Sequence, residues 1–158
     1  MPPKAFFEPP SFKEGNQFTR KDSPLFLECS ASQDFQEHAR FNRSFRVYLK
    51  DSAKGVKEPI GKIATAYFPK EQKVDVGILE IDPRFQGKGY GKESLRTVLG
   101  IYRSPKNSSL AYNHFFLTVS IDNNAAIALY RGVGFQVDEN LTSKGIPWLY
   151  MTLSRDVE

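Results

Sequence analysis

The sequence of 158 residues is poor in cysteine and contains no long apolar segment. Its one cysteine, Cys29, cannot form an internal disulfide or supply a cysteine-based zinc site, so we expect no bound metal. No apolar run approaches the ~20 residues that span a bilayer, and the N-terminus lacks the apolar stretch of a secretory signal. These absences predict a soluble cytoplasmic protein with no membrane partner.

Acidic residues are almost missing from one short segment, residues 84–106. This segment holds six lysines and arginines against a single acid, Glu93, and its charge of +5 exceeds the +4 of the whole chain. A protein that coats nucleic acid spreads its basic residues more widely, and the segment lacks the interleaved aromatics of a base-stacking platform. The pattern therefore predicts a local anion site and disfavours nucleic acid as a partner.

The order of the expected elements predicts one α/β domain. Residues 1–24 are expected to form a proline-rich N-terminal arm, whose phenylalanines should pack against the rest of the protein. Residues 25–158 are expected to form the domain. Alternating or continuous apolar residues predict strands at 25–29, 45–49, 60–68, 74–81, 115–120, 136–137 and 148–153. Apolar stripes at helical spacing predict helices at 89–103 and 124–133, and a short helix is expected at 34–41. Hairpins followed by a βαβ-like unit indicate a mixed, mainly antiparallel central sheet of six to seven strands flanked by helices.

A glycine-rich turn, Gln86-Gly87-Lys88-Gly89-Tyr90-Gly91-Lys92, follows a predicted strand and opens a predicted helix. Glycines allow a close approach to a ligand, and the unpaired N–H groups of a helix start attract phosphate. The nucleoside-triphosphate loop would need glycine at Gln86 and serine or threonine at Glu93, and the dinucleotide fingerprint would need G-x-G-x-x-G. The spacing instead satisfies Q/R-x-x-G-x-G/A, the loop that holds the coenzyme A pyrophosphate.

Two stretches resemble the signature motifs of one enzyme family. Residues 74–95, VDVGILEIDPRFQGKGYGKESL, look like the central motif of the GCN5-related N-acetyltransferases, the GNAT family. Residues 116–119, FLTV, resemble the family's fifth strand, and NNAAIALY at 123–130 with Gly134-Phe135 resembles its N-x-x-A-I-x-L-Y…G-F signature. The resemblance covers about residues 45–153. It implies a GNAT-like fold and direct acetyl transfer, in a ternary complex, from acetyl-coenzyme A as cosubstrate to a primary amine.

The resemblance also implies roles for individual residues. The residues implied to bind the cofactor are Leu79, Ile81, Gln86, Gly87, Lys88, Gly89, Tyr90, Gly91, Lys92, Asn123, Ala126 and Tyr130. A bulge in the family's fourth strand, expected here at 79–81, would free backbone N–H groups for the thioester carbonyl. Tyr130 matches the acid that protonates the leaving thiolate, although its spacing alone favours a core aromatic. The candidate bases are Asp75, Glu80 and His114, with the first two ranked equal and a water relay as the alternative.

Aromatic walls beside an acid would suit a positively charged amine acceptor. The residues expected to contact the acceptor are Tyr48, Tyr67, Glu80, Trp148 and Tyr150. The sequence of residues 81–93 resembles that of the diamine and polyamine acetyltransferase branch, so we expect a small polyamine-like acceptor. A protein N-terminus, a lysine or an aminoglycoside is the enzymatic alternative, and a coenzyme-A-binding sensor is the non-enzymatic one. Family members are commonly dimers, so a homodimer is also implied.

Overall fold

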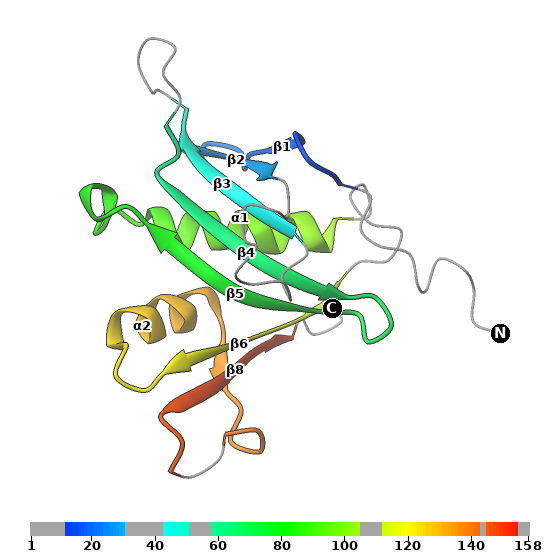
Figure 1. Cartoon of the computed structure of the whole chain (residues 1–158), viewed down its shortest axis with the longest axis vertical. Helices are drawn as coiled ribbons and strands as arrows, with labels where there is room; N and C mark the ends of the chain where they lie inside the picture. The colour runs from blue at the N-terminus through cyan, green and yellow to red at the C-terminus, as the bar shows by residue number, and fades with distance from the viewer. Residues whose placement is uncertain (1–11, 31–42, 51–57, 105–111, 143–144, 155–158) are drawn as a thin grey trace, which may run out of the picture.

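The computed structural model describes residues 12–30, 43–50, 58–104, 112–142 and 145–154. Its centre is one mixed sheet, in which the described residues form eight strands in the order β1-β2-β3-β4-β5-β6-β8-β7 (Figure 1). The strands are β1 (Gln17–Phe18), β2 (Leu25–Ser30), β3 (Arg43–Leu49), β4 (Gly61–Phe68), β5 (Lys73–Ile81), β6 (His114–Ser120), β7 (Gln136–Val137) and β8 (Trp148–Ser154). Neighbouring strands are antiparallel except β5 and β6, which are parallel. The expected mixed, mainly antiparallel α/β fold is confirmed.

Two α-helices form where the apolar stripes predict them. Helix α1 (Tyr90–Arg103) packs its buried stripe against the sheet, and helix α2 (Asn124–Val133) connects β6 to β7. A short 3-10 helix, η4 (Pro83–Phe85), links β5 to the glycine-rich turn. The helix expected at 34–41 lies outside the described residues. Within the described ranges, neither helix combines the length and the apolar character that crossing a bilayer requires.

The strand that the sequence did not predict is β1, which lies in the N-terminal segment expected to be an arm. β1 pairs with β2, and Phe12 is 3% exposed in the main core. The Phe12 ring lies 5.6 Å from the Phe45 ring and 5.3 Å from the Tyr102 ring, between centroids. Residues 12–24 are therefore packed into the domain rather than appended to it, because their aromatic side chains complete its core. Residues 1–11 lie outside the described part of the chain.

The two faces of the sheet differ in character. On one face, residues such as Phe45, Ile63 and Val74 are fully buried and form the main core with α1. Directly paired residues on neighbouring strands point to the same face, so the register defines the other one, which we call the second face. It carries two cross-strand rows, Arg46–Lys62–Glu80 and Ala66–Asp75–Phe116–Thr152.

A bulge in β5 lies next to the point where β5 leaves β6. Ala64 pairs with Ile78 and Thr65 with Val76, so Gly77 is the extra residue on β5. The bulge thus lies two residues before the 79–81 stretch from which free N–H groups are expected, and only the register of the partner strand shows which residue is skipped. The parallel pairing of β5 with β6 covers only residues 73–75, and Figure 1 shows the two strands separating beyond it, on the side where α2 lies.

Candidate active site

A cleft of about 630 Å³ opens where β5 and β6 separate. Its walls come from the end of β5, the glycine-rich turn, the start of α1 and one side of α2. The lining residues are Leu79, Ile81, Phe85, Gln86, Gly87, Gly89, Tyr90, Gly91, Lys92, Asn123, Ala125, Ala126, Ala128, Leu129 and Tyr130. This set contains eleven of the twelve predicted cofactor residues. The exception is Lys88, whose ammonium lies 6.0 Å from the centre of the Phe85 ring. Four lining residues are not among the predicted ones, because apolar wall residues carry no motif signal: Phe85, Ala125, Ala128 and Leu129.

The turn at the start of α1 has the backbone geometry of an anion site. Gly87 and Gly89 have φ values of +80° and +82°, which residues with a side chain rarely adopt. Gly89 is the N-cap of α1, and no side chain among the described residues caps the helix. Gly89, Tyr90 and Gly91 line the cleft, so the uncapped start of α1, with its partial positive charge, lies at the cleft wall. Gln86 Nε2 donates to the Ile81 carbonyl oxygen at 2.8 Å and ties the turn to β5.

Glycines also let the two helices approach one another. A Cβ atom added at Gly91 would lie 3.0 Å from Leu129 Cδ1 of α2, closer than ordinary packing allows. A Cβ atom added at Gly132 would lie 3.2 Å from Lys92 Nζ, so the Lys92 side chain crosses from α1 onto α2. Lys92, which also lines the cleft, thus brings a positive charge to its wall.

Helix α2 contributes one polar cap and one buried phenol to the cleft. Asn123 is the N-cap, and its Oδ1 accepts a hydrogen bond from Ala126 N at 3.1 Å, a role the motif match did not reveal. Tyr130 is 8% exposed, and its ring meets Phe135 edge-on at 6.0 Å between centroids. Burial raises the pKa of Tyr130 above its ordinary value of 10, so the phenol keeps its proton at neutral pH. Tyr130 is therefore both a core aromatic and a cleft residue. A place in the core is compatible with a role as proton donor in the cleft.

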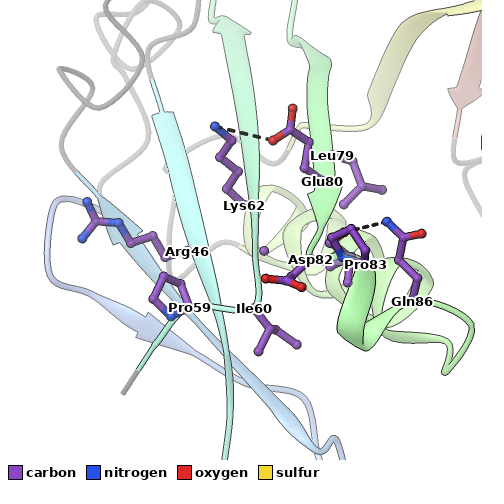
Figure 2. A pocket seen from close by; sticks show the side chains of 11 residues that line it. Arg46, Pro59, Ile60, Lys62, Leu79, Glu80, Asp82, Pro83 and Gln86 are labelled. Carbon is purple, nitrogen blue, oxygen red and sulfur yellow. Dashed lines mark hydrogen bonds and ion pairs between the residues drawn. The ribbon is translucent and has the colours of Figure 1, made fainter. Parts of the chain in front are cut away.

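The structure separates the two acids that the sequence ranked equal. Asp75 is 9% exposed on the second face, two residues before the bulge at Gly77. Glu80 lies on the same face, three residues after Gly77, but its Oε2 lies 3.5 Å from Lys62 Nζ and its side chain is 65% exposed. Figure 2 shows this pair at the rim of a second groove, of about 570 Å³, which is lined by β3, β4 and the end of β5. Burial beside the bulge favours Asp75 over Glu80 as the residue that meets the amine.

His114, the third candidate base, lies at the start of β6, at the opposite end of the strands from the glycine-rich turn. Its Nδ1 is 2.9 Å from Ser154 Oγ, and its parallel partner on β5 is Lys73. In β5, Lys73 precedes the bulge at Gly77 by four residues, about 13 Å at 3.3 Å per residue. This separation disfavours His114 as the base.

The five residues predicted to contact the acceptor are not brought together. Tyr150 and Trp148 lie on the second face, and the Tyr150 ring stacks on Phe116 with centroids 5.6 Å apart. Burial raises the pKa of Tyr150, and the negative charges of Asp75 and Asp138 raise it further. Tyr150 and Asp75 therefore share one region of the second face, near the bulge.

The remaining two tyrosines of that prediction lie elsewhere. Tyr48 stacks on Phe26 at 5.0 Å, near the β2 edge of the second face. Tyr67 lies on the core face, where its ring contacts Tyr112 and the Arg43 guanidinium is 5.1 Å from the ring centre. Tyr67 is thus on the wrong side of the sheet for an acceptor held by Asp75, because neighbouring strand residues point to opposite faces.

The match to known proteins agrees with this geometry. Residues 11–135, well over half of the chain, match the acetyltransferase (GNAT) family, and the chain belongs to that family. Over 62 residues it is 40% identical to the N-alpha-acetyltransferase RimI of Mycobacterium tuberculosis, a stretch that covers 39% of this chain and 34% of RimI. The chain thus matches only about a third of the length of this relative.

Solved structures share the fold at low sequence identity. The ribosomal L7/L12 alpha-N-protein acetyltransferase RimL has a TM-score of 0.63 and 16% identity, with 89% of this chain and 97% of that one covered. A GNAT family acetyltransferase from Elizabethkingia anophelis, solved with acetyl-CoA bound, has a TM-score of 0.61 and 13% identity, with coverage of 85% and 100%. Both likenesses concern the fold.

Proposed function

We propose that the protein transfers the acetyl group of acetyl-coenzyme A to an amine, and that the acceptor is the α-amino group of a protein N-terminus. One observation carries the acetyl transfer: the helix-start turn, the bulged strand and the buried phenol of Tyr130 all border one cleft. Family membership and the stretch shared with RimI support the activity, and the same stretch supports an N-terminal acceptor.

The residues of the cleft fit the coenzyme. The left-handed glycines and the uncapped start of α1 present N–H groups to the pyrophosphate, and Lys92 adds a positive charge. Leu79 and Ile81 give an apolar wall for the pantetheine arm, and beyond Asp75 no described strand occupies the β6 side of β5. The backbone N–H groups of that side are free to hold the arm and the acetyl carbonyl. When bound, the coenzyme supplies an activated acetyl thioester.

Two side chains would move the protons. Tyr130 keeps its phenolic proton at neutral pH because it is buried, and it can donate that proton toward the departing sulfur from the cleft wall. Asp75, on the second face beside Gly77, would orient the acceptor ammonium and take up its proton, directly or through a water. The acid and the base would then act from opposite sides of the opening between β5 and β6.

The acceptor side favours a cationic group next to an aromatic wall. Asp75 gives a carboxylate, and the stacked rings of Phe116 and Tyr150 give the wall. A peptide α-ammonium and a polyamine both meet this requirement. The stretch shared with RimI favours the α-amine. The sequence of the glycine-rich turn makes a polyamine the second candidate.

A panel of acceptors tests the proposal. Release of free coenzyme A thiol would be followed with unblocked peptides, with the same peptides N-terminally blocked and containing a lysine, and with spermidine, spermine and an aminoglycoside. We expect turnover of the unblocked peptides only. Turnover confined to polyamines would contradict the N-terminal acceptor. Binding of acetyl-coenzyme A in a calorimeter without turnover of any acceptor would indicate a sensor instead.

A further inference from the structure

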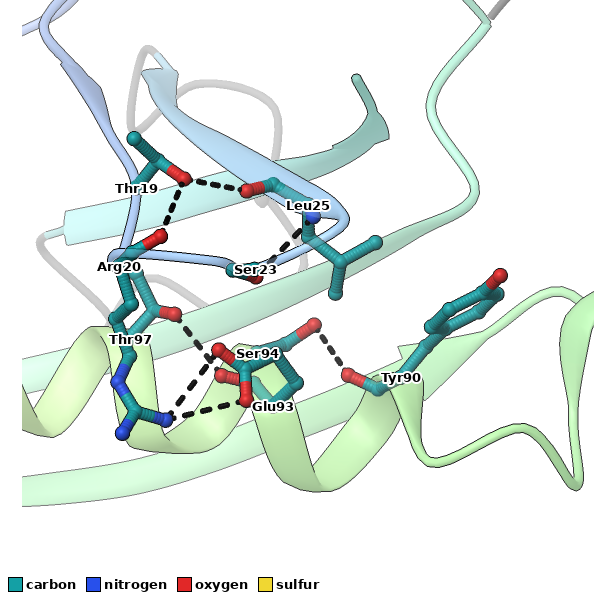
Figure 3. A network of polar contacts seen from close by, with 8 residues as sticks. All are labelled: Thr19, Arg20, Ser23, Leu25, Tyr90, Glu93, Ser94 and Thr97. Atoms are coloured by element: carbon teal, nitrogen blue, oxygen red, sulfur yellow. Dashed lines mark hydrogen bonds and ion pairs between the residues drawn. The ribbon is translucent and has the colours of Figure 1, made fainter. Parts of the chain in front are cut away.

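One ion pair joins the N-terminal segment to the first turns of α1. Arg20 Nη1 lies 3.1 Å from Glu93 Oε2 and 3.3 Å from its Oε1, although 73 residues separate the two in sequence (Figure 3). Glu93 is the fourth residue of α1 and the single acid among the basic residues of 84–106. Arg20 therefore neutralises the one charge in this segment that opposes an anion.

The turn that carries Arg20 is itself fixed to the core. Thr19 Oγ1 donates to the Leu25 carbonyl oxygen at 2.7 Å, and Leu25 N donates to Ser23 Oγ at 3.2 Å. Ser23 and Leu25 are buried, at 6% and 1% exposure, and Figure 3 shows this turn lying over the start of α1. The backbones of both partners are therefore held in ordered elements, and their side chains are 46% and 22% exposed.

We infer that Arg20 is a positioning residue for coenzyme binding, because it cancels the negative charge of Glu93 beside the phosphate-binding turn. This inference rests on the proposed function. Glu93 follows the N-cap Gly89 by four residues, which places its backbone about 6 Å along the helix axis. For two such charges about 9 Å apart at an effective dielectric of about 60, the repulsion between one carboxylate and a doubly charged anion corresponds to binding weakened about 3- to 10-fold, which sets the size of effect expected for an uncompensated Glu93.

Calorimetry with coenzyme A tests this role in the full chain. The Arg20→Gln variant should raise the Kd about 3- to 10-fold at roughly 0.05 M salt, and the difference should nearly vanish at about 1 M salt because of screening. Adding Glu93→Gln to Arg20→Gln should restore the wild-type Kd, since the opposing charge is then gone. The matched control is Lys21→Gln, which removes the same charge from the adjacent residue and should change the Kd by less than about 2-fold.

The outcomes separate this inference from the proposed function. If the wild type binds coenzyme A and Arg20→Gln binds equally well, Arg20 has no role in binding. If the loss persists at high salt, or if Glu93→Gln does not rescue it, Arg20 acts only by holding the turn in place, and the electrostatic role is wrong. A wild type that binds no coenzyme A would instead contradict the proposed function on which the inference rests. If the Arg20→Gln variant transfers acetyl groups with the wild-type kcat and a raised KM for acetyl-coenzyme A, this result would further support the electrostatic role of Arg20.

Discussion

Replacing Tyr130 by phenylalanine should remove the proton donor of the reaction and leave the cleft intact. The side chain is 8% exposed and its ring packs on Phe135, and the substitution keeps that ring and removes one hydroxyl. We therefore expect a stability change below about 1 kcal/mol and an unchanged Kd for coenzyme A. General acid catalysis contributes about 10²- to 10⁴-fold, so kcat should fall at least about 100-fold, which is about 2.7 kcal/mol of barrier.

The pH dependence gives a second measure of the same role. Burial raises the pKa of Tyr130 above 10, so its protonated, donating form persists through neutral and mildly alkaline pH. The ratio of wild-type to Tyr130→Phe rates should stay constant from about pH 7 to 9.5. It should shrink only when the pH approaches the raised pKa of Tyr130, above 10, because the wild type then loses the phenolic proton.

Initial rates of thiol release at saturating acetyl-coenzyme A, with the best acceptor of the panel, measure both effects. The control is Tyr112→Phe, a change at another buried tyrosine, whose pKa burial raises to about 12 and which does not line the cleft. It should keep kcat within about 3-fold of the wild type. A wild-type kcat for Tyr130→Phe would refute the assignment and leave Tyr130 as a core aromatic only.

Two further substitutions test other parts of the structure. Phe12→Ala should lower the free energy of unfolding by about 3 kcal/mol and the Tm by roughly 6–12 °C, because Phe12 is 3% exposed among core rings. Phe68→Ala, at a side chain 39% exposed, should cost less than about 1 kcal/mol, and equal Tm values for the two variants would show that the N-terminal segment is not part of the core. Asp75→Asn should lower kcat/KM for the acceptor about 100-fold and Glu80→Gln less than about 3-fold, because Glu80 is exposed and paired with Lys62. The reverse order in steady-state assays would make Glu80 the group that meets the amine.

The conformation of the glycine-rich turn, proposed to bind the coenzyme, could be predicted because it is local in sequence. Gln86, Gly89 and Gly91 lie within six residues, and the backbone conformation they require depends on the glycines themselves. The acceptor half could not be predicted in this way, because it depends on which face of a strand each residue occupies. Tyr67 and Asp75 illustrate this: both lie in predicted strands, but the register places them on opposite faces.

The helices, the central strands and the glycine-rich turn follow from the sequence, since apolar periodicity and glycine conformation act over short distances. Contacts between distant segments set the position of the bulge at Gly77, the burial of Phe12 and the pairing of Arg20 with Glu93. Another such contact is the 2.6 Å hydrogen bond between Tyr102 Oη and Thr65 Oγ1 in the core. These features join segments up to 90 residues apart, and they form only when the register of the sheet brings those segments together.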